Sequence, residues 1–187
     1  MKRLIRALFL VALSSMLASC AVWTRLDAAR LSGPDGLSVQ PPAGWMRFNL
    51  AGDRVIDLTR DGRPIQILRI EYRKHDQAFP AIKKKSTPDM LPSEAADLML
   101  ADLKADPSLA NIQVVENRPY RVAGKPGFWL HGRYRDGRGA PFDLVAVGRP
   151  TQDGLLVVFY RALSAYYYPR DLKTFEQTVA SIELARK

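Results

Sequence analysis

The side chains of this sequence that are best suited to chemistry are one thiol, Cys20, and two imidazoles, His75 and His131. His131 lies in the run Trp129–Arg133, which is typical of a strand, and an imidazole facing a cleft could act as a general base. No nucleophile or acid is spaced with it, so we interpret His131 as a half-buried strand histidine. His75 lies at the start of a loop, and we interpret it as a solvated surface histidine.

Motifs of familiar catalytic sites are absent from the sequence. It has no Gly-x-Ser-x-Gly elbow, no Gly-x-x-x-x-Gly-Lys loop and no His-Glu-x-x-His pair. Two histidines would need carboxylates to complete a zinc site, and nothing is spaced to provide them. We therefore predict no metal site, no cofactor and no enzymatic activity. A hydrolase built around His131 stays as an alternative, and it requires a serine or an acid within hydrogen-bond reach of that ring.

The residues before Cys20 predict export and covalent modification of the thiol. A short cationic head at Lys2, Arg3 and Arg6 precedes an apolar run, Ala7–Met16, and this order is typical of a secretory signal peptide. Small residues then lead directly to the cysteine. This ending resembles the lipobox of bacterial lipoproteins, and it consists of Leu17, Ala18, Ser19 and Cys20.

The lipobox resemblance implies cleavage between Ser19 and Cys20 and acyl chains, such as palmitate, on the cysteine. Ala21 stands where an aspartate commonly retains such proteins in the inner membrane, so the resemblance implies the periplasmic face of the outer membrane, with the inner membrane as the alternative. An ordinary signal peptide cut elsewhere would instead leave Cys20 as a buried or reactive thiol. A permanent membrane span is disfavoured, because the apolar run is far shorter than the ~20 residues that a bilayer requires.

Composition indicates one globular domain after the signal peptide. The chain has 187 residues, of which 47% are hydrophobic and 25% charged, and a formal net charge of +9. The arginines are scattered, so the excess charge is interpreted as a solvated surface. Attraction to anionic lipid or polysaccharide is the alternative, and nucleic acid is not expected as a partner of an exported protein.

The first half of the mature chain is predicted to be a tether, strands and one helix. Turn-forming residues predict a tether over residues 20–36. Strands are expected over 37–40 and 45–50, and an Asp-Gly turn joins strands 54–59 and 64–73 into a hairpin. A connection over 74–92 contains three prolines. Ser93 is expected to be the N-cap of a helix that ends near residue 105.

The second half is predicted to be a strand meander and a last helix. Two short strands are expected over residues 111–115 and 120–123, followed by a turn over 124–127. Strands over 128–135, 141–149 and 155–162 are separated by turns that contain Asp-Gly. A helix is expected over 169–184. This order predicts an α+β domain over residues 37–187, an antiparallel β-sheet covered by helices.

Two short motifs and the order of elements resemble those of PsbP-like domains. Pro42–Trp45 resembles their Pro-x-Gly-Trp opening, and Gly124–Phe128 resembles a turn that leads into a long strand. The resemblance extends over residues 37–184 and implies an α/β/α sandwich. Members of this family include extrinsic photosystem subunits, a nuclear-import factor and bacterial lipoproteins, which share docking to a larger partner.

A basic and aromatic surface is the candidate binding site. Arg133 and Arg135 are expected on one strand face with His131, and they would form a cationic patch if Arg69 or Arg73 lay on a neighbouring strand. The alternative is exposed arginines that keep the sheet edge soluble. Three consecutive tyrosines precede the last helix, and at least one of them is expected to be exposed at an interface or to anchor the helix start. They are Tyr166, Tyr167 and Tyr168.

Three functions are compatible with these features. The first is a lipid-anchored, non-enzymatic docking or accessory module on an envelope assembly, with an envelope protein as partner and the membrane bound through acyl chains. The second is a carrier of a small ligand or lipid, which requires an apolar cavity. The third is the hydrolase.

Overall fold

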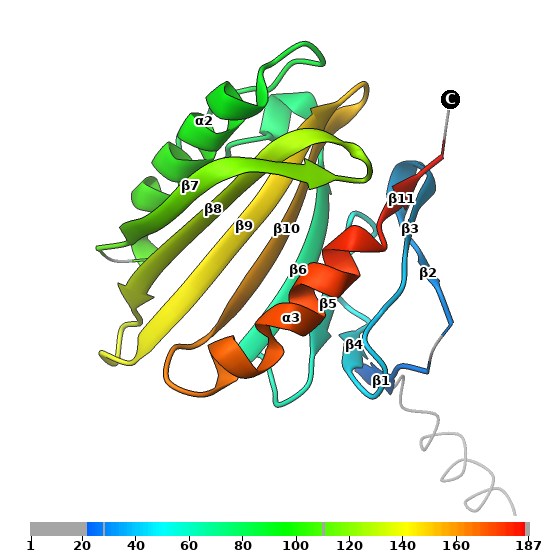
Figure 1. The fold of residues 1–187 in the computed structure, drawn as a ribbon, viewed down its shortest axis with the longest axis vertical. Helices are drawn as coiled ribbons and strands as arrows, with labels where there is room; N and C mark the ends of the chain where they lie inside the picture. The colour runs from blue at the N-terminus through cyan, green and yellow to red at the C-terminus, as the bar shows by residue number, and fades with distance from the viewer. Residues whose placement is uncertain (1–21, 28, 110, 186–187) are drawn as a thin grey trace, which may run out of the picture.

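The computed structural model describes residues 22–27, 29–109 and 111–185. Within these residues the strands form an eight-stranded antiparallel sheet and a separate three-stranded sheet (Figure 1). In sheet order, the large sheet contains β1 (Trp23–Arg25), β4 (Met46–Phe48), β5 (Val55–Thr59), β6 (Gln66–Arg73), β10 (Gly154–Leu163), β9 (Pro141–Thr151), β8 (Lys125–Arg135) and β7 (Gln113–Val122). The small sheet contains β11 (Glu183–Leu184), β3 (Leu37–Val39) and β2 (Leu31–Ser32).

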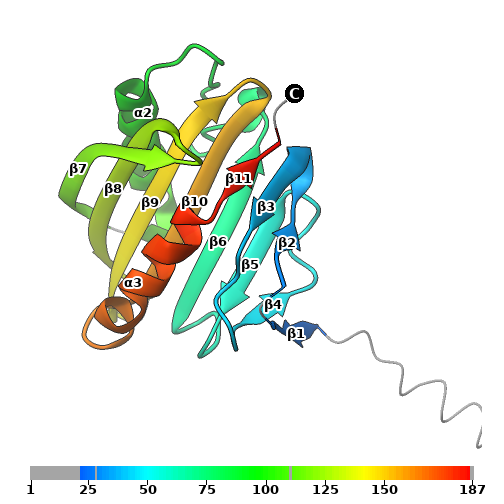
Figure 2. The same cartoon turned by 45° about the vertical axis from the view of Figure 1, so that its right-hand side comes forward.

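Two helices cover opposite faces of the large sheet (Figures 1 and 2). Helix α2 (Pro92–Ala105) packs on β8 and β9, whereas α3 (Tyr167–Ala180) packs on the other face, on β10 and β6. The small sheet lies beside α3 (Figure 2). Short 3-10 turns complete the described elements: η1 (Pro34–Gly36), η2 (His75–Gln77) and η3 (Pro107–Leu109). The predicted α+β class and α/β/α sandwich are confirmed.

Alternation along the strands divides the buried residues between two cores. In β10, Val158 and Tyr160 belong to the core under α3, while Val157 and Phe159 belong to the core under α2. Both faces of this central strand are apolar because both are covered. Burial of this apolar surface is the main term that stabilises the fold.

The strand meander is confirmed, with one difference at its outer edge. Strand β7 is a single strand with an irregularity between Val114 and Glu116, not two short pieces. Pro119 is tolerated within it because β7 is an edge strand, where a missing N–H breaks no ladder bond. The turn before β8 is also shorter than predicted, because Ala123 and Gly124 alone form it with positive φ angles of 48° and 71°.

Both helices begin earlier than predicted. Ser93 is inside α2 and the N-cap is Leu91, because Pro92 at the first helical position needs no N–H partner. Helix α3 begins at Tyr167 and ends at Ala180. The chain beyond it leaves the helix and pairs with β3 as β11, so the prediction of a helix to residue 184 was wrong.

Residues 22–36, which we expected to be a tether, contain two strands. Trp23 of β1 pairs with Phe48 of β4, and Leu31 of β2 pairs with Val39 of β3. The side chain of Leu26 is buried in the core under α3. The ordered fold therefore begins before residue 37. Ser19, Cys20 and Ala21, with the rest of the predicted signal peptide, lie outside the described residues, and within the described part no helix is long and apolar enough to cross a membrane.

Candidate functional site

His131 is buried against the N-terminal turn of α3. Its Nε2 lies 2.6 Å from Asp143 Oδ1, and the ring of Tyr168 stacks on the imidazole at a centroid distance of 5.1 Å. Asp143 is the acid that the hydrolase alternative required. Among the described side chains, however, no hydroxyl or thiol is hydrogen-bonded to the ring, so no nucleophile accompanies this pair. Asp143 orients the imidazole within the packed face.

Asp143 is also the partner of Arg133. Arg133 Nε donates to Asp143 Oδ1 at 2.9 Å, although the arginine side chain is 62% exposed. Burial alone would raise the pKa of Asp143, but Ser164, Arg133 and His131 face it and hold the pKa below its usual value. The Ser164 hydroxyl contributes to this lowering of the pKa, although its oxygen has no hydrogen-bond partner of good geometry.

The predicted cationic patch does not form with β6. Arg133 and Arg135 are on the α3 face of β8, and Arg135 donates to the carbonyl of Gly139 at 2.7 Å. Arg69 and Arg73 are on β6, which two strands separate from β8, and they face the opposite side of the sheet. Sequence spacing could not reveal this, because strand order depends on long-range pairing.

The three tyrosines have three different environments. Tyr166 is 59% exposed, Tyr167 is half-buried and Tyr168 is buried. The Arg170 guanidinium lies over the first two rings, at 5.2 and 5.0 Å from their centroids. Tyr160 donates from its hydroxyl to the carbonyl of Tyr167 at 2.8 Å. At least one exposed ring was predicted, and Tyr166 is exposed. The rings of Tyr167 and Tyr168 anchor the start of α3.

His75 is not the solvated side chain that we expected. Its Nδ1 lies 2.8 Å from Ser86 Oγ, and its Nε2 lies 3.2 Å from the carbonyl oxygen of Gln152. The ring therefore links the connection over residues 74–91 to the turn between β9 and β10. This role is structural.

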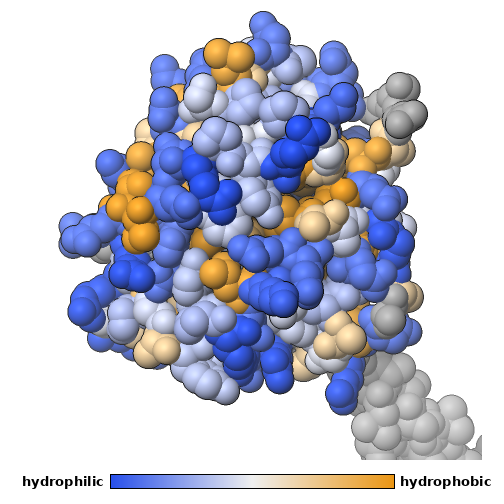
Figure 3. All heavy atoms as spheres, in the orientation of Figure 1, coloured by the Kyte–Doolittle hydropathy of each residue, from blue (hydrophilic) through white to orange (hydrophobic). Residues whose placement is uncertain are grey.

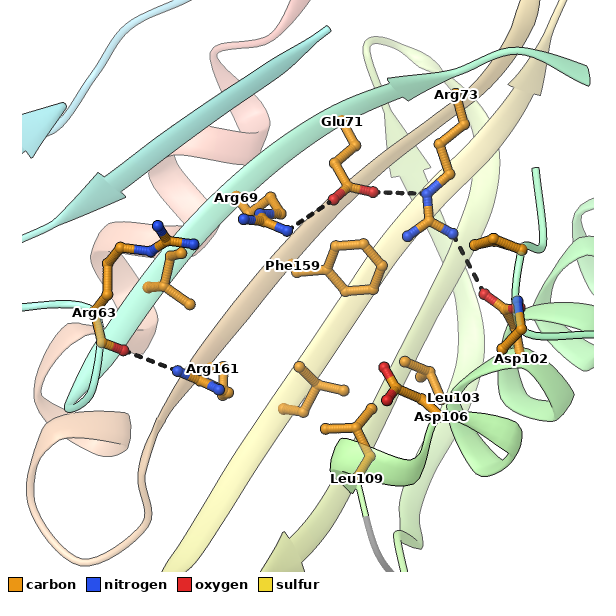
Figure 4. Close-up of a pocket in the computed structure, with 14 residues that line it drawn as sticks. Arg63, Arg69, Glu71, Arg73, Asp102, Leu103, Asp106, Leu109, Phe159 and Arg161 are labelled. Atoms are coloured by element: carbon orange, nitrogen blue, oxygen red, sulfur yellow. Dashed lines mark hydrogen bonds and ion pairs between the residues drawn. The ribbon is translucent and has the colours of Figure 1, made fainter. Parts of the chain in front are cut away.

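The candidate functional site is a groove beside α2. Because α2 packs mainly on β8 and β9, the neighbouring strands β10 and β6 are left open on the same face, and a hollow of about 280 Å³ lies there (Figure 4). We call this hollow the arginine groove. Its apolar lining includes Ile67 and Phe159, and four arginines also line it: Arg63, Arg69, Arg73 and Arg161.

Ion pairs run along one wall of the arginine groove. In β6 the residues Arg69, Glu71 and Arg73 face the groove, because alternate residues of a strand share a face. Arg69 Nη1 lies 3.3 Å from Glu71, and Glu71 lies 2.6 Å from Arg73 Nε (Figure 4). The series continues at both ends, through Asp57 to Arg63 at 3.3 Å and from Arg73 to Asp102 at 3.4 Å.

Asp102 joins this series to α2. Its Oδ1 accepts hydrogen bonds from the backbone N–H groups of Ala81 and Ile82, at 2.7 and 3.3 Å. Its Oδ2 faces Arg73, which also donates to the carbonyl of Ala78 at 3.0 Å. The wall is therefore fixed at α2, at the loop that precedes it and at β6, and the arginine groove is held in shape before any ligand binds.

Arg161 differs from the other three arginines of the groove. Its Nη2 donates to the carbonyl of Arg63 at 2.8 Å, and its guanidinium lies 5.2 Å from the ring of Phe142. Among the described residues it forms no ion pair with a carboxylate, and its buried Nε has no hydrogen-bond partner. Figure 4 shows the Arg161 side chain beside Arg63, away from the acids of the wall.

The arginine groove has the features of a binding site. Of the acids in or beside the groove, Asp57, Glu71 and Asp102 are paired with arginines. Asp106 also lines the groove, and its Oδ1 accepts hydrogen bonds from the N–H and the hydroxyl of Ser108 at 2.8 and 2.7 Å. Within the described residues there is no group of three histidine, cysteine or carboxylate side chains that could hold a metal ion. A planar guanidinium above aromatic and aliphatic side chains is a site for a carboxylate with an apolar neighbour.

Comparison with known proteins identifies the fold. No protein-family model matches the chain, and no curated protein matches it in sequence. Its structure is similar to that of a point mutant of the protein Mog1, with TM-score 0.55 and 9% identity over 85% of this chain and 96% of that chain. It is also similar to the cyanobacterial PsbP (CyanoP) of Synechocystis sp. PCC 6803, with TM-score 0.51 and 14% identity over 90% and 95%.

A larger protein contains the same fold. A Bacteroides thetaiotaomicron protein matches with TM-score 0.51 and 12% identity, over 87% of this chain and 50% of that chain, so this chain spans about half of its length. At such identities the likeness establishes the fold alone. The fold is PsbP-like, as the sequence motifs implied.

Sequence reasoning missed the arginine groove although part of its signal was visible. In 64–73 neither alternating set is purely polar, and Arg69, Glu71 and Arg73 alternate with apolar residues. That pattern indicates a charged row on a strand that is otherwise buried. The positions of Asp102 and Arg161 along this row could not be read from the sequence, because α2 and β10 reach it by long-range packing.

Proposed function

We propose that this protein is a lipid-anchored, non-enzymatic accessory module of the bacterial cell envelope that docks a partner protein through the arginine groove. The observation that carries the docking role is Arg161, a cation without a carboxylate partner at the side of a preformed groove. Anchoring is supported by the lipobox-like residues at Leu17–Cys20. The periplasmic face of the outer membrane is the proposed location, since Ala21 follows the cysteine.

The chemistry of the arginine groove defines the partner segment. Arg161 would receive a carboxylate from an acidic loop of an envelope protein, in a bidentate hydrogen-bonded pair. An apolar side chain next to that carboxylate would cover Ile67 and Phe159. Charge supplies specificity in such an interface, while the buried apolar contact supplies much of the affinity.

The carrier alternative requires an apolar container, and within the described residues neither the arginine groove nor a second, larger hollow is one. This larger hollow, of about 580 Å³, lies beside β11 and is lined mostly by charged and polar side chains, among them Arg149, Asp153 and Tyr72. Carrier sites are lined predominantly by apolar side chains that enclose the ligand. On the face of the molecule shown in Figure 3, hydrophobic residues emerge in several separate areas between hydrophilic ones.

Site-directed photocrosslinking in intact cells tests the docking role. A benzoylphenylalanine at Ala81, on the rim of the arginine groove, should form an adduct with one envelope protein. The same probe at Lys173, exposed on α3, should not form that adduct. Arg161→Gln should abolish the adduct, because it removes the cation and leaves a shorter, uncharged polar side chain.

A matched control separates a local effect from a general loss of charge. Arg138→Gln removes a positive charge from an arginine whose side chain is 82% exposed in the turn between β8 and β9, and it should leave the adduct unchanged. An adduct that survives Arg161→Gln, or that forms equally from Lys173, would contradict the docking role. The mass of the mature protein reports separately whether Cys20 is acylated.

A further inference from the structure

The edge strand β1 follows the predicted lipidation site almost directly. Only Ala21 separates Cys20 from Val22, and an extended chain spans at most about 3.6 Å per residue, so Val22 lies within roughly 7 Å of the cysteine along the chain. Val22 is already tied to the fold, because its carbonyl accepts a hydrogen bond of 3.0 Å from the N–H of Asn49. An acylated Cys20 would therefore hold this edge at the bilayer.

Strand β1 cannot act as a flexible spacer, because it is part of the sheet. Its three residues pair with β4 in the order Trp23 to Phe48, Thr24 to Arg47 and Arg25 to Met46. The Asn49 side chain also donates to the Thr24 hydroxyl at 2.8 Å. The body of the protein would thus meet the membrane at a defined place.

Exposed apolar side chains gather at this edge. Val22 is 43% exposed, and Leu50, next to the residue that bonds the Val22 carbonyl, is 68% exposed. Trp23 is half-buried, and its ring packs against that of Phe48 at a centroid distance of 4.9 Å and an interplanar angle of 47°. Exposed large apolar side chains cost free energy in water, and tryptophan is enriched at membrane interfaces, where its ring is buried and its N–H stays hydrated.

Two arginines flank the apolar group on the two sides of the edge. Arg25 is exposed on one face of β1, and Arg47 is on β4 with its side chain toward the other face. Neither forms an ion pair with a carboxylate in the part of the chain that the structure describes. The exposed acids of the same region are Asp27 and Asp53, and Asp27 accepts a hydrogen bond from the N–H of Ala29. Charge at this edge is mixed, so apolar contact is the main term.

We propose that the β1 edge is a bilayer-contacting surface, with Val22, Trp23 and Leu50 at the level of the lipid headgroups and Arg25 and Arg47 beside lipid phosphates. The proposal rests on the acylation in the proposed function. Acyl chains and this edge together provide the two membrane contacts that stable anchoring requires. The sheet is then oriented by the membrane. The arginine groove opens on the same face of the sheet as Trp23, and its Arg63 lies over the ring of Phe48 at 4.7 Å.

Tryptophan fluorescence tests this surface without labels. Trp45 and Trp129 are each 3% exposed, so Trp23 is the tryptophan that lipid can reach. The full-length acylated protein is reconstituted into vesicles of phosphatidylethanolamine and phosphatidylglycerol, with plain or brominated acyl chains. Brominated lipid should quench part of the wild-type emission, and Trp23→Phe should lose that quenched part. Equal emission in the two kinds of vesicle would overturn the proposal.

A pair of leucine variants keeps the test independent of changes at Trp23. Leu50→Ser should reduce the quenching, whereas Leu91→Ser, which alters a 64% exposed leucine at the start of α2, should not. Equal effects of the two variants would also overturn the proposal. A protein without acyl chains by mass would instead contradict the anchoring in the proposed function.

Discussion

Asp57 and Arg69 face each other across β5 and β6, and their side chains form two parallel hydrogen bonds of 2.6 and 2.7 Å. Asp57 is 1% exposed, while one-third of the Arg69 side chain is accessible. The bond to Asp57 is the main reason that the pKa of Arg69 is raised above its ordinary value. Bidentate pairs combine charge with fixed geometry, so this pair sets the position of the charged wall beside the arginine groove.

Asp57→Asn should destabilise the protein by about 2 kcal/mol, since it leaves Arg69 and Arg63 without their shared buried partner. Partial exposure of both arginines keeps the effect below that of a fully buried pair. In urea unfolding, Asp57→Asn combined with Arg69→Gln should cost less than the sum of the two single changes. Additive losses would show that the two side chains do not act together.

Asp171 should make stability depend on pH in the acid range. It is buried and accepts hydrogen bonds from Gln66 Nε2 at 2.8 Å and from Arg60 and Arg170. Burial alone would raise its pKa, but the donors hold the pKa below the ordinary value. A carboxyl whose pKa is lower in the folded state stabilises it above the unfolded pKa of about 3.9, and this contribution is lost as pH falls further.

Asp171→Asn should therefore lower the free energy of unfolding by about 2 kcal/mol at neutral pH, and by progressively less below about pH 4. The measurement is urea unfolding of both proteins across this pH range. Asp97→Asn, at an exposed position of α2, serves as the control and should change little at any pH. A deficit of Asp171→Asn that stays constant down to the lowest pH would contradict the assignment.

The elements that the sequence predicted well are those with local signals. Turns containing Asp-Gly set the hairpins on either side of β9, and apolar spacing located α2 and most of α3. Strands β1 and β2 were missed because each has only two or three residues and exists through pairing with a distant segment. The neighbours of β6 also depend on long-range pairing. For this reason the sequence could not decide whether Arg69 or Arg73 joins Arg133 in a patch, and it gave no indication of a role for Arg161.

Gly154 should not tolerate a side chain, because β6 and β10 approach closely there. A Cβ at this position would lie 2.1 Å from the carbonyl oxygen of Arg73, a backbone atom that cannot move without shifting β6. Gly154→Ala should cost at least about 2 kcal/mol and disturb the arginine groove. Gly137→Ala is the matched control, since a Cβ there meets nothing within 4 Å. Thermal unfolding of both variants checks the difference, and similar midpoints would contradict the close approach.

The tyrosines before α3 should separate into an anchoring ring and a surface ring. Tyr168 stacks on His131 and on Tyr160, with centroid distances of 5.1 and 5.8 Å, so Tyr168→Ala removes a buried ring and should cost about 3 kcal/mol. Tyr166→Ala alters a 59% exposed ring and should change stability by no more than about 0.5 kcal/mol. Urea unfolding of the two variants measures this contrast. If Tyr166→Ala instead proves as costly as Tyr168→Ala, its contact with Arg170 anchors the helix as firmly as the stacked ring does, and the division between core and surface drawn here is wrong.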